Sequence, residues 1–273
     1  MSDQKAGKKK PEARKKNSRE SPLFVASTEK VFQVLHAFGG PEKQMPLSRI
    51  AEIAKLDRSA TQRVVYTLET LGYLRRVPNT RNYATTSRLL QFGYDYLRGN
   101  ELVSRASPYL LEVSRTVGET VSLHEMDGHE IVYVARFPGK HLLNVDIMVG
   151  TRLPAIFTAS GTAMLSTCEP DRLEEVLQAP ARPLTPLSLT DRDKLRARIV
   201  AARDKGYVII SNETVLGDIS VASSITDRHG RAIAGISIAV PETRWSLERV
   251  EQDLVKQVQL AAASLSEPRF IPA

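Results

Sequence analysis

The sequence predicts an α+β protein whose two domains are joined by a helix. Its 273 residues are enough for two domains of ordinary size, each with its own core. The first hundred residues show helical periodicity that leads into two short strands, and the remainder shows strand-like runs between amphipathic helices. Charge is divided in the same way: residues 1–20 hold 8 basic and 3 acidic side chains, residues 21–99 hold 11 and 6, and residues 100–273 hold 19 and 22.

This charge division indicates a polyanion partner for the N-terminal part, because lysine and arginine bind phosphate backbones by displacing counterions. Residues 1–20 have almost no apolar side chain to bury, so we expect a disordered basic arm. Two roles for this arm stay open: added non-specific affinity for DNA, and solubility alone.

The sequence contains no targeting or membrane signal. No apolar run approaches the ~18 residues of a transmembrane helix, and the charged N-terminus lacks the apolar segment of a signal peptide. The single cysteine, Cys168, cannot form an internal disulfide or a cysteine-based zinc site, which suits a reducing compartment. We therefore expect a soluble cytoplasmic protein with no membrane partner.

Three helices are expected near the N-terminus. The first covers residues 27–38 and is capped by Ser27 or Thr28, and the second covers residues 47–54. The third is expected to start at Ser59, because Ser59–Gln62 has the S-x-x-Q form of a capping box. It has an apolar stripe that should pack in the core and a polar face that should meet a partner. The stripe consists of Val64, Val65, Leu68 and Leu71, and the polar face of Ser59, Gln62, Arg63 and Tyr66.

Two short strands follow these helices. Residues 73–77 and 82–85 are expected to pair around the turn Pro78–Arg81, as a basic hairpin or wing. Helices and hairpin together predict a winged helix-turn-helix domain over residues 21–86. The alternative is an ordinary two-helix packing unit with a solvated charged face.

Residues 87–100 are expected to link the domains, with the boundary at Gly99-Asn100. The helix predicted over residues 87–97 is apolar on more than one side and needs more than one neighbour, so we expect it to pack against a second subunit. The C-terminal domain, residues 101–268, should be an antiparallel sheet with flanking helices. Its helices are expected over residues 102–117, 160–166, 170–177, 191–205 (capped by Thr190) and 246–265, and its strands over residues 120–124, 130–135, 142–147, 207–211, 219–226 and 232–240.

No catalytic or metal-binding pattern is present. His124 and His129 are five residues apart in a strand-turn region, whereas H-E-x-x-H needs histidines four apart on a helix. The segment around Ser160 has threonine at both glycine positions of G-x-S-x-G. We therefore expect no catalytic residue, metal or cofactor, and Ser160 either contacts a ligand or caps a helix.

Three segments occur in an order and at separations that are typical of one family. They are LDRSATQRVVYTLETLGY around the third helix, GTRLPAIFTASGTAMLS before a small-residue helix, and KGYVIISNETVLGDISVASSITDRHGRAIAGISIAVP near the C-terminus. The last has Gly206, Glu213, Gly217 and Pro241 in place. Together they resemble the IclR family of bacterial transcriptional regulators.

The resemblance implies a winged helix-turn-helix domain followed by a GAF-like effector-binding domain, in a dimer or a dimer of dimers. This sequence departs from the family pattern at Ile210 and Ala239, where some relatives have polar ligand contacts, at Ser223, which replaces a common proline, and at Lys55, which replaces a common glycine. A less polar pocket is therefore expected. Carried over by position, the family's effector contacts fall on Ala159, Ser160, Ser220 and Ser237.

These observations predict a DNA-binding transcriptional regulator that responds to a small organic acid and controls a catabolic operon. Arg152 and the pocket hydroxyls would hold the acid's carboxylate. Two other classes stay open: an enzyme whose pocket is the C-terminal domain, and an architectural DNA-binding protein without sequence preference. For operator DNA, we expect base contacts from Ser59, Gln62, Arg63 and Tyr66, and phosphate contacts from Arg58, Arg75, Arg76 and Arg81.

Overall fold

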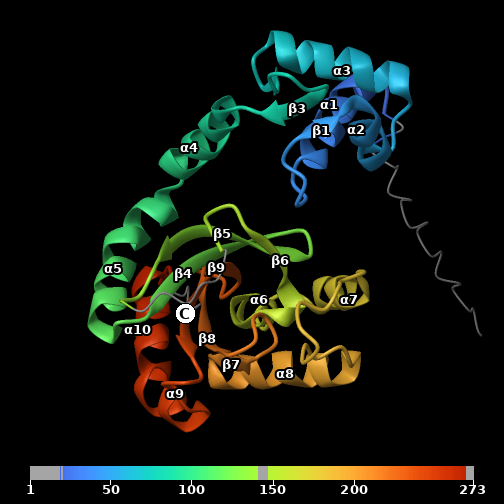
Figure 1. The fold of residues 1–273 in the computed structure, drawn as a ribbon. Coiled ribbons are helices and arrows are strands. Elements are labelled where there is room, and N and C mark those ends of the chain that lie inside the picture. The colour runs from blue at the N-terminus through green and yellow to red at the C-terminus, as the bar shows by residue number, and fades with distance from the viewer. Residues whose placement is uncertain (1–18, 20, 141–146, 269–273) are drawn as a thin grey trace, which may run out of the picture. The chain divides into compact units, whose positions relative to one another are not determined.

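The computed structural model describes residue 19 and residues 21–140 and 147–268. The chain forms two compact units whose boundary lies between Phe92 and Gly93, inside the predicted linker helix (Figure 1). The strand expected over residues 142–147, except Ile147, and nearly all of the predicted basic arm lie outside the described residues. Within the described residues, no helix is both long and apolar enough to cross a membrane.

The N-terminal unit is a winged helix-turn-helix, as predicted. Its helices are α1 (Ala26–Ala37), α2 (Leu47–Ala54) and α3 (Arg58–Thr70), and its strands are β1 (Met45–Pro46), β2 (Leu74–Arg76) and β3 (Asn82–Thr85), paired antiparallel in the order β1-β3-β2. Strand β1 differs from expectation, because two residues are too short to show a periodicity. The core side chains come from every one of these elements and include Val34, Met45, Ile50, Val65, Leu68, Leu74 and Ala84.

The start of α3 corrects the expected capping box. Asp57, not Ser59, is the N-cap: its Oδ1 accepts a hydrogen bond from the Ala60 amide at 2.8 Å. The helix therefore begins one residue before Ser59. Thr61 is buried and donates to the Asp57 carbonyl, whereas Leu71, expected in the core stripe, is half exposed. Asp is about as good an N-cap residue as Ser, and the S-x-x-Q pattern favours Ser59 over Asp57.

The cap expected from Ser27 or Thr28 is absent, and one turn residue has an uncommon conformation. Val25 precedes α1, and no side chain caps that helix. Lys55, in the turn after α2, has a φ of +55° and a left-handed conformation. A lysine there costs about 1 kcal/mol relative to glycine, so the turn geometry is kept in spite of the sequence departure.

The linker region contains the short 3-10 helix η2 (Ser87–Leu89) and α4 (Leu90–Gly99). No residue of α4 is buried. Its large apolar side chains form two exposed stripes at i,i+4 spacing, Leu90 with Tyr94 and Phe92 with Tyr96. Asn100 then caps α5 (Glu101–Val117) by accepting a hydrogen bond from the Val103 amide at 3.0 Å.

The C-terminal unit is built on a six-stranded antiparallel sheet of order β6-β5-β4-β9-β8-β7. Helices α5 and α10 cover one face of the sheet and α6 lies against the other (Figure 1). The strands are β4 (Thr120–Asp127), β5 (Glu130–Phe137), β6 (Arg152–Pro154), β7 (Val208–Ser211), β8 (Asp218–Thr226) and β9 (Ala232–Pro241); the helices are η3 (Ala155–Phe157), α6 (Ala159–Leu165), α7 (Pro170–Gln178), α8 (Arg192–Lys205), α9 (Leu247–Asp253) and α10 (Val255–Leu265).

The α+β prediction is confirmed, with three local differences. Strand β6 occupies a segment expected to be a loop. Asp191, not Thr190, caps α8 through hydrogen bonds from the amides of Asp193 and Lys194. The single C-terminal helix is interrupted at the buried Leu254, whose φ of −108° lies far from the ordinary helical value of about −63° while its backbone stays in the right-handed region. The apolar periodicity continues across this break, so the sequence pattern predicts one helix.

Candidate functional sites

The polar face of α3 is exposed. Ser59, Gln62, Arg63 and Tyr66 all face solvent, and Tyr66 is 69% exposed. The opposite side of the helix is fixed by Thr61, Val65 and Leu68 in the core, which leaves this face for a partner. A shallow groove of about 300 Å³ runs along it, lined by Leu47, Ser59, Gln62, Arg63, Tyr66, Glu69, Arg76 and Tyr83.

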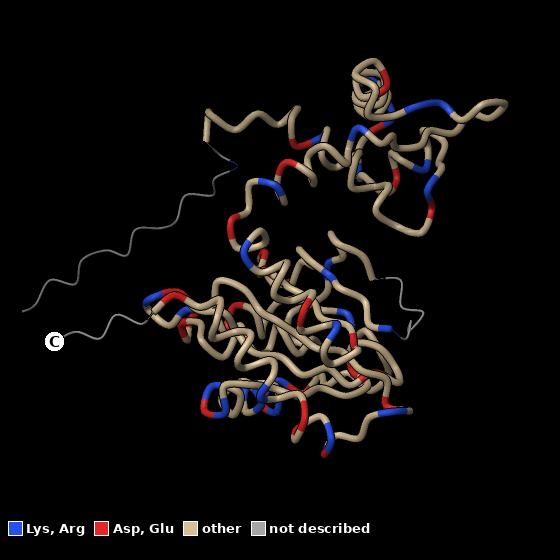
Figure 2. The backbone as a smooth tube through the Cα atoms, turned by 90° about the vertical axis from the view of Figure 1, so that its left-hand side faces the viewer, with Lys and Arg blue, Asp and Glu red and all other residues tan. Residues whose placement is uncertain are grey.

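The wing is tied to the same face through Arg76. Its Nε lies 3.1 Å from Oε1 of Glu69 in α3, and its guanidinium lies over the ring of Tyr83, 5.4 Å from the centroid. The other three arginines expected to hold phosphates, Arg58, Arg75 and Arg81, are exposed. Figure 2 marks the Lys and Arg positions along the backbone of this unit. The structure thus brings the predicted base-contacting residues and one predicted phosphate contact, Arg76, onto one groove.

A second site lies in the C-terminal unit, where one end of the sheet encloses a cavity of about 40 Å³. Its walls come from β4, β5, β8 and β9 and from the loop before β8. Most of the described lining residues carry a polar group: they are Thr120, Ser122, Tyr133, Arg136, Thr214, Asp218, Ser220 and Ser237, and Ile147, Val215 and Ala239 are the apolar members among them.

Strand register explains how these polar side chains meet. Ser122 is opposite Arg136 on one side and Ser237 on the other, and Ser220 is opposite Ala239. Because alternate residues of a strand point to opposite faces, the intervening residues, such as Val121, point into the core instead. The hydroxyl and guanidinium groups therefore share the face that α6 only partly covers.

Asp218 is the carboxylate in this cavity. It is only 8% exposed, and its Oδ2 accepts a hydrogen bond from Ser220 Oγ at 2.6 Å. Burial raises its pKa to about 6, with the Ser220 hydrogen bond and the positive charge of Arg136 opposing the rise. Burial also raises the pKa of Tyr133 to about 12, so its hydroxyl stays protonated near neutral pH. The cavity combines a cation, an acid and neutral hydroxyls.

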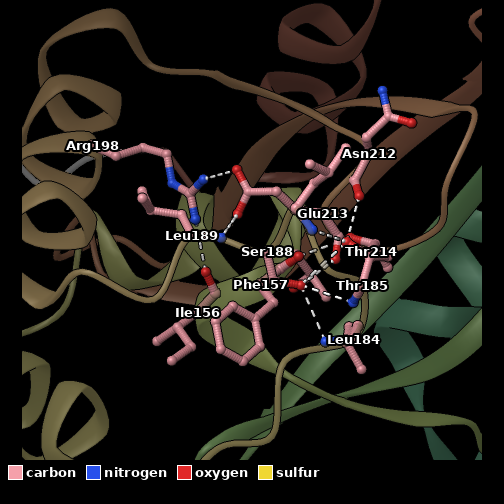
Figure 3. Close-up of polar contacts among 12 residues, drawn as sticks. Ile156, Phe157, Leu184, Thr185, Ser188, Leu189, Arg198, Asn212, Glu213 and Thr214 are labelled. Carbon is pink, nitrogen blue, oxygen red and sulfur yellow. Dashed lines mark hydrogen bonds and ion pairs between the residues drawn. The ribbon is translucent and has the colours of Figure 1, made fainter.

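The loop that carries Thr214 and Val215 into the cavity wall is held in place by an ion pair (Figure 3). Arg198 of α8 places Nη1 2.5 Å from Glu213 Oε1, and its Nη2 donates to the Ile156 carbonyl at 2.8 Å. The other oxygen of Glu213 accepts a hydrogen bond from the Leu189 amide at 2.9 Å. Both carboxylate oxygens of Glu213 therefore have protein partners, and Glu213 does not line the cavity.

Three hydroxyl groups hold the backbone of the same loop (Figure 3). Thr185 donates to the Asn212 carbonyl at 2.6 Å, and Ser188 donates to the Glu213 carbonyl at 2.8 Å. Thr214 donates to the Phe157 carbonyl at 2.8 Å. The family-typical Glu213 thus has a structural role, which is to fix one wall of the cavity.

The four expected effector contacts divide into two pairs. Ser220 and Ser237 line the cavity, whereas Ala159 and Ser160 do not; both are buried in α6. Ser160 does not cap that helix either, because Thr158 is the N-cap and accepts a hydrogen bond from the Gly161 amide at 3.1 Å.

The grouping of Arg152 with the pocket hydroxyls is wrong. Arg152 pairs with Asp127 and Glu130, at 2.8 Å each, and does not line the cavity. Among the described residues, Arg136 is the arginine that lines the cavity. The signal that could have identified Arg136 is the β4–β5 pairing, which puts it beside Ser122, but this register has to be known first.

His124, considered as a metal ligand, is a buried residue of β4. Its Nδ1 lies 3.2 Å from the Gly235 carbonyl, and its ring meets Tyr133 edge-on at 4.3 Å. Burial lowers its pKa to about 3, so the ring is neutral. Among the described residues there is no group of three His, Cys, Asp or Glu side chains that could hold a metal ion.

Each of the two units matches the model of a known protein family. The IclR helix-turn-helix domain matches residues 27–78, and the C-terminal domain of the bacterial transcriptional regulator IclR matches residues 94–267. The transcriptional regulator KdgR of Escherichia coli (strain K12) is 29% identical over 246 residues, which cover 90% of this chain and 93% of KdgR. The Pca regulon regulatory protein of Pseudomonas putida is 28% identical over 251 residues, 91% of this chain and 86% of that protein.

A solved structure shows the same architecture with a ligand. The IclR homologue of Microbacterium hydrocarbonoxydans, complexed with 4-hydroxybenzoate, has a TM-score of 0.72 and 26% identity, and the match covers 88% of this chain and 97% of that chain. Because the C-terminal match alone spans more than half of the residues, the chain belongs to the IclR family of bacterial transcriptional regulators.

Proposed function

We propose that this protein is a ligand-responsive regulator that binds operator DNA through α3 and the wing, and a small organic acid in the C-terminal cavity. The observation that carries the proposal is the polar cavity around Arg136, which lies in a different compact unit from the exposed face of α3. The 4-hydroxybenzoate complex of one relative and the Pca regulon named for another support an organic acid and a catabolic operon.

The DNA-binding side of the proposal rests on side-chain chemistry. Arg63 can make two hydrogen bonds to a guanine edge, and Gln62 can make two to an adenine edge. Ser59 and Tyr66 would complete the base contacts. Arg58, Arg75, Arg76 and Arg81 would bind phosphates and set the position of the helix, without reading sequence themselves.

A dimer would place two copies of α3 on a two-fold operator. We propose that α4 supplies part of the subunit contact, because its Leu90–Tyr94 and Phe92–Tyr96 stripes are exposed on opposite sides of the helix. Leu90→Glu should convert the oligomer to a smaller species in light scattering. The matched control is Leu187→Glu, which changes another exposed leucine, in the C-terminal unit. Identical masses for both variants and the wild type would exclude a role for α4.

Ligand control follows from differential binding. The acid can change operator affinity only as far as it prefers one arrangement of the two α3 helices over another. Such a coupling is typically worth about 5- to 150-fold in affinity.

The testing experiment begins with operator selection from random-sequence DNA. Binding is then measured by fluorescence anisotropy on the selected and a scrambled duplex, with and without organic acids found by thermal shift. A preference for the selected duplex that an acid changes supports the proposal. Equal affinity for both duplexes would indicate an architectural protein instead, and turnover of the bound acid would indicate an enzyme.

A further inference from the structure

The cavity is lined by two opposite charges that are not joined in an ion pair. Arg136 and Asp218 both line it, yet they form no ion pair, and Arg136 makes no hydrogen bond or ion pair with any described residue. Oδ2 of Asp218 has its partner in Ser220, but no donor within the described part of the chain reaches Oδ1. Oδ1 is not a fully enclosed atom, so a donor that enters the cavity can reach it, whereas a ligand that covered it without donating would leave it unpaired.

Among the residues that the structure describes, the surroundings of Asp218 offer no other compensating charge. Strand β5 contributes Arg136 and Tyr133, and β4 contributes the neutral His124 beyond the hydroxyls of Thr120 and Ser122. The lining residues of β9 are Ser237 and Ala239, and α6 has no titratable side chain. In the loop before β8, the acid Glu213 is bound to Arg198.

We propose that the effector is a bifunctional acid: its carboxylate binds Arg136, and a hydroxyl or amine elsewhere in the same molecule donates a hydrogen bond to Asp218. This inference rests on the proposed function and specifies its ligand. Both charged groups of the cavity are then satisfied by one molecule, while an acid without a donor would leave Oδ1 of Asp218 buried and unpaired.

The size of the cavity guides the choice of probes. Its volume of about 40 Å³ is well below the roughly 150 Å³ that holds a benzene ring. One series is therefore aliphatic: propionate, 3-hydroxypropionate and β-alanine. The second is aromatic, benzoate, 4-hydroxybenzoate and 4-aminobenzoate, and tests whether the cavity enlarges to admit a ring.

Isothermal titration calorimetry on the full-length protein measures the affinity of each acid. The wild type should bind the hydroxy or amino member of a series at least about tenfold more tightly than its unsubstituted parent, because the lost partner of a buried carboxylate is worth at least one such factor. Asp218→Leu should reduce this preference to less than about twofold. Asp218→Asn distinguishes the donors: it keeps an acceptor for a hydroxyl but loses the charge that favours an amine.

Two controls complete the experiment. Asp204→Asn changes an exposed aspartate of α8 and should leave all affinities unchanged. Arg136→Met should weaken every acid of both series. Melting temperatures and circular dichroism establish that each variant is folded, and Asp218→Asn, which conserves the side-chain shape, answers the question if Asp218→Leu does not fold.

The outcomes separate this inference from the proposed function. If unsubstituted acids bind through Arg136 as tightly as hydroxy and amino acids do, or if Asp218→Leu and Asp218→Asn retain the wild-type preference, the inference is wrong and an organic-acid effector stands. If no acid of either series binds the wild type, the proposed effector class fails and this inference fails with it.

Discussion

Glu69 of α3 and Arg76 of β2 form an ion pair, 3.1 Å between Oε1 and Nε, that joins the recognition helix to the wing. The pair is largely exposed, so it adds at most about 1 kcal/mol to stability. Its larger consequence is for DNA binding. Glu69 holds Arg76 in position, but it also places a negative charge in the groove that should receive the duplex.

Arg76→Ala should weaken binding to selected and scrambled DNA alike and reduce the salt dependence of log K by about 0.9 for each phosphate that the variant no longer neutralises. Glu69→Gln should tighten binding to both duplexes at low salt, since it removes the negative charge. Anisotropy titrations at two salt concentrations measure both effects. If Arg76→Ala lowers affinity for the selected duplex only, Arg76 contacts bases and its assignment to phosphate is wrong.

Arg63→Ala should remove sequence preference. The expected loss is about 1–3 kcal/mol on the selected duplex, with a much smaller change on scrambled DNA. Lys43→Ala, an exposed cation outside the α3 groove, is the matched control and should change both affinities little. The assignment is contradicted if the two duplexes lose affinity in equal proportion in Arg63→Ala.

Glu213→Gln should destabilise the C-terminal unit by about 2–4 kcal/mol, because it leaves the largely buried Arg198 without its charged partner. Effector affinity should fall as well, since the loop with Thr214 and Val215 loses its support. Glu174→Gln breaks the exposed pair with Arg196 and should cost much less, because solvent screens the two charges. Urea denaturation compares the two, and equal losses of stability would show that Glu213 has no special role.

Gly161→Ala should lower the melting temperature, because a Cβ there would lie 2.2 Å from the Ala155 carbonyl oxygen and 2.5 Å from its Cα. Such overpacking against backbone typically costs about 1–3 kcal/mol. Gly99→Ala is the control, since nothing lies within 4 Å of its added Cβ. A Gly161→Ala protein as stable as the wild type would mean that α6 can move away from η3 at little cost.

Asp218 should make stability depend on pH in a defined direction. Its folded pKa is about 6, above the ordinary 3.8, so the folded state binds this proton more tightly than the unfolded state. The free energy of unfolding should therefore rise as pH falls from about 6 to about 4, by up to about 3 kcal/mol relative to Asp218→Asn. Urea titrations of both proteins across this range test the difference, and parallel profiles would contradict the raised pKa.

The parts that the sequence predicts well are those with strong periodicity. The stripe around Val65 and Leu68 places Gln62 and Arg63 on the exposed side of α3, and strand-like runs between turn signals predict five of the six strands of the C-terminal sheet. The cavity could not be predicted in the same way. Arg136 and Asp218 come from strands far apart in the chain, and only their register brings them together.

Two wrong assignments have a common physical cause. Ser59 as the N-cap of α3 and Arg152 as a residue of the cavity are both predicted from residue type and local spacing. In each case a neighbouring residue competes for the same partner or role and decides the outcome. Asp57 directly precedes the first residue of α3 and caps it. Glu130 lies in β5, which pairs with β6, and forms an ion pair with Arg152. Neither competition can be decided until the backbone geometry is known.

A ligand bound in the cavity should change the affinity of the α3 face for operator DNA. The most direct measurement is the operator dissociation constant of the wild type and of Arg136→Met at increasing concentrations of a bound organic acid. In the wild type this dissociation constant should change by about fivefold or more, and the change should disappear in Arg136→Met. An operator affinity that stays constant in the wild type while calorimetry shows the acid saturating its site would contradict it.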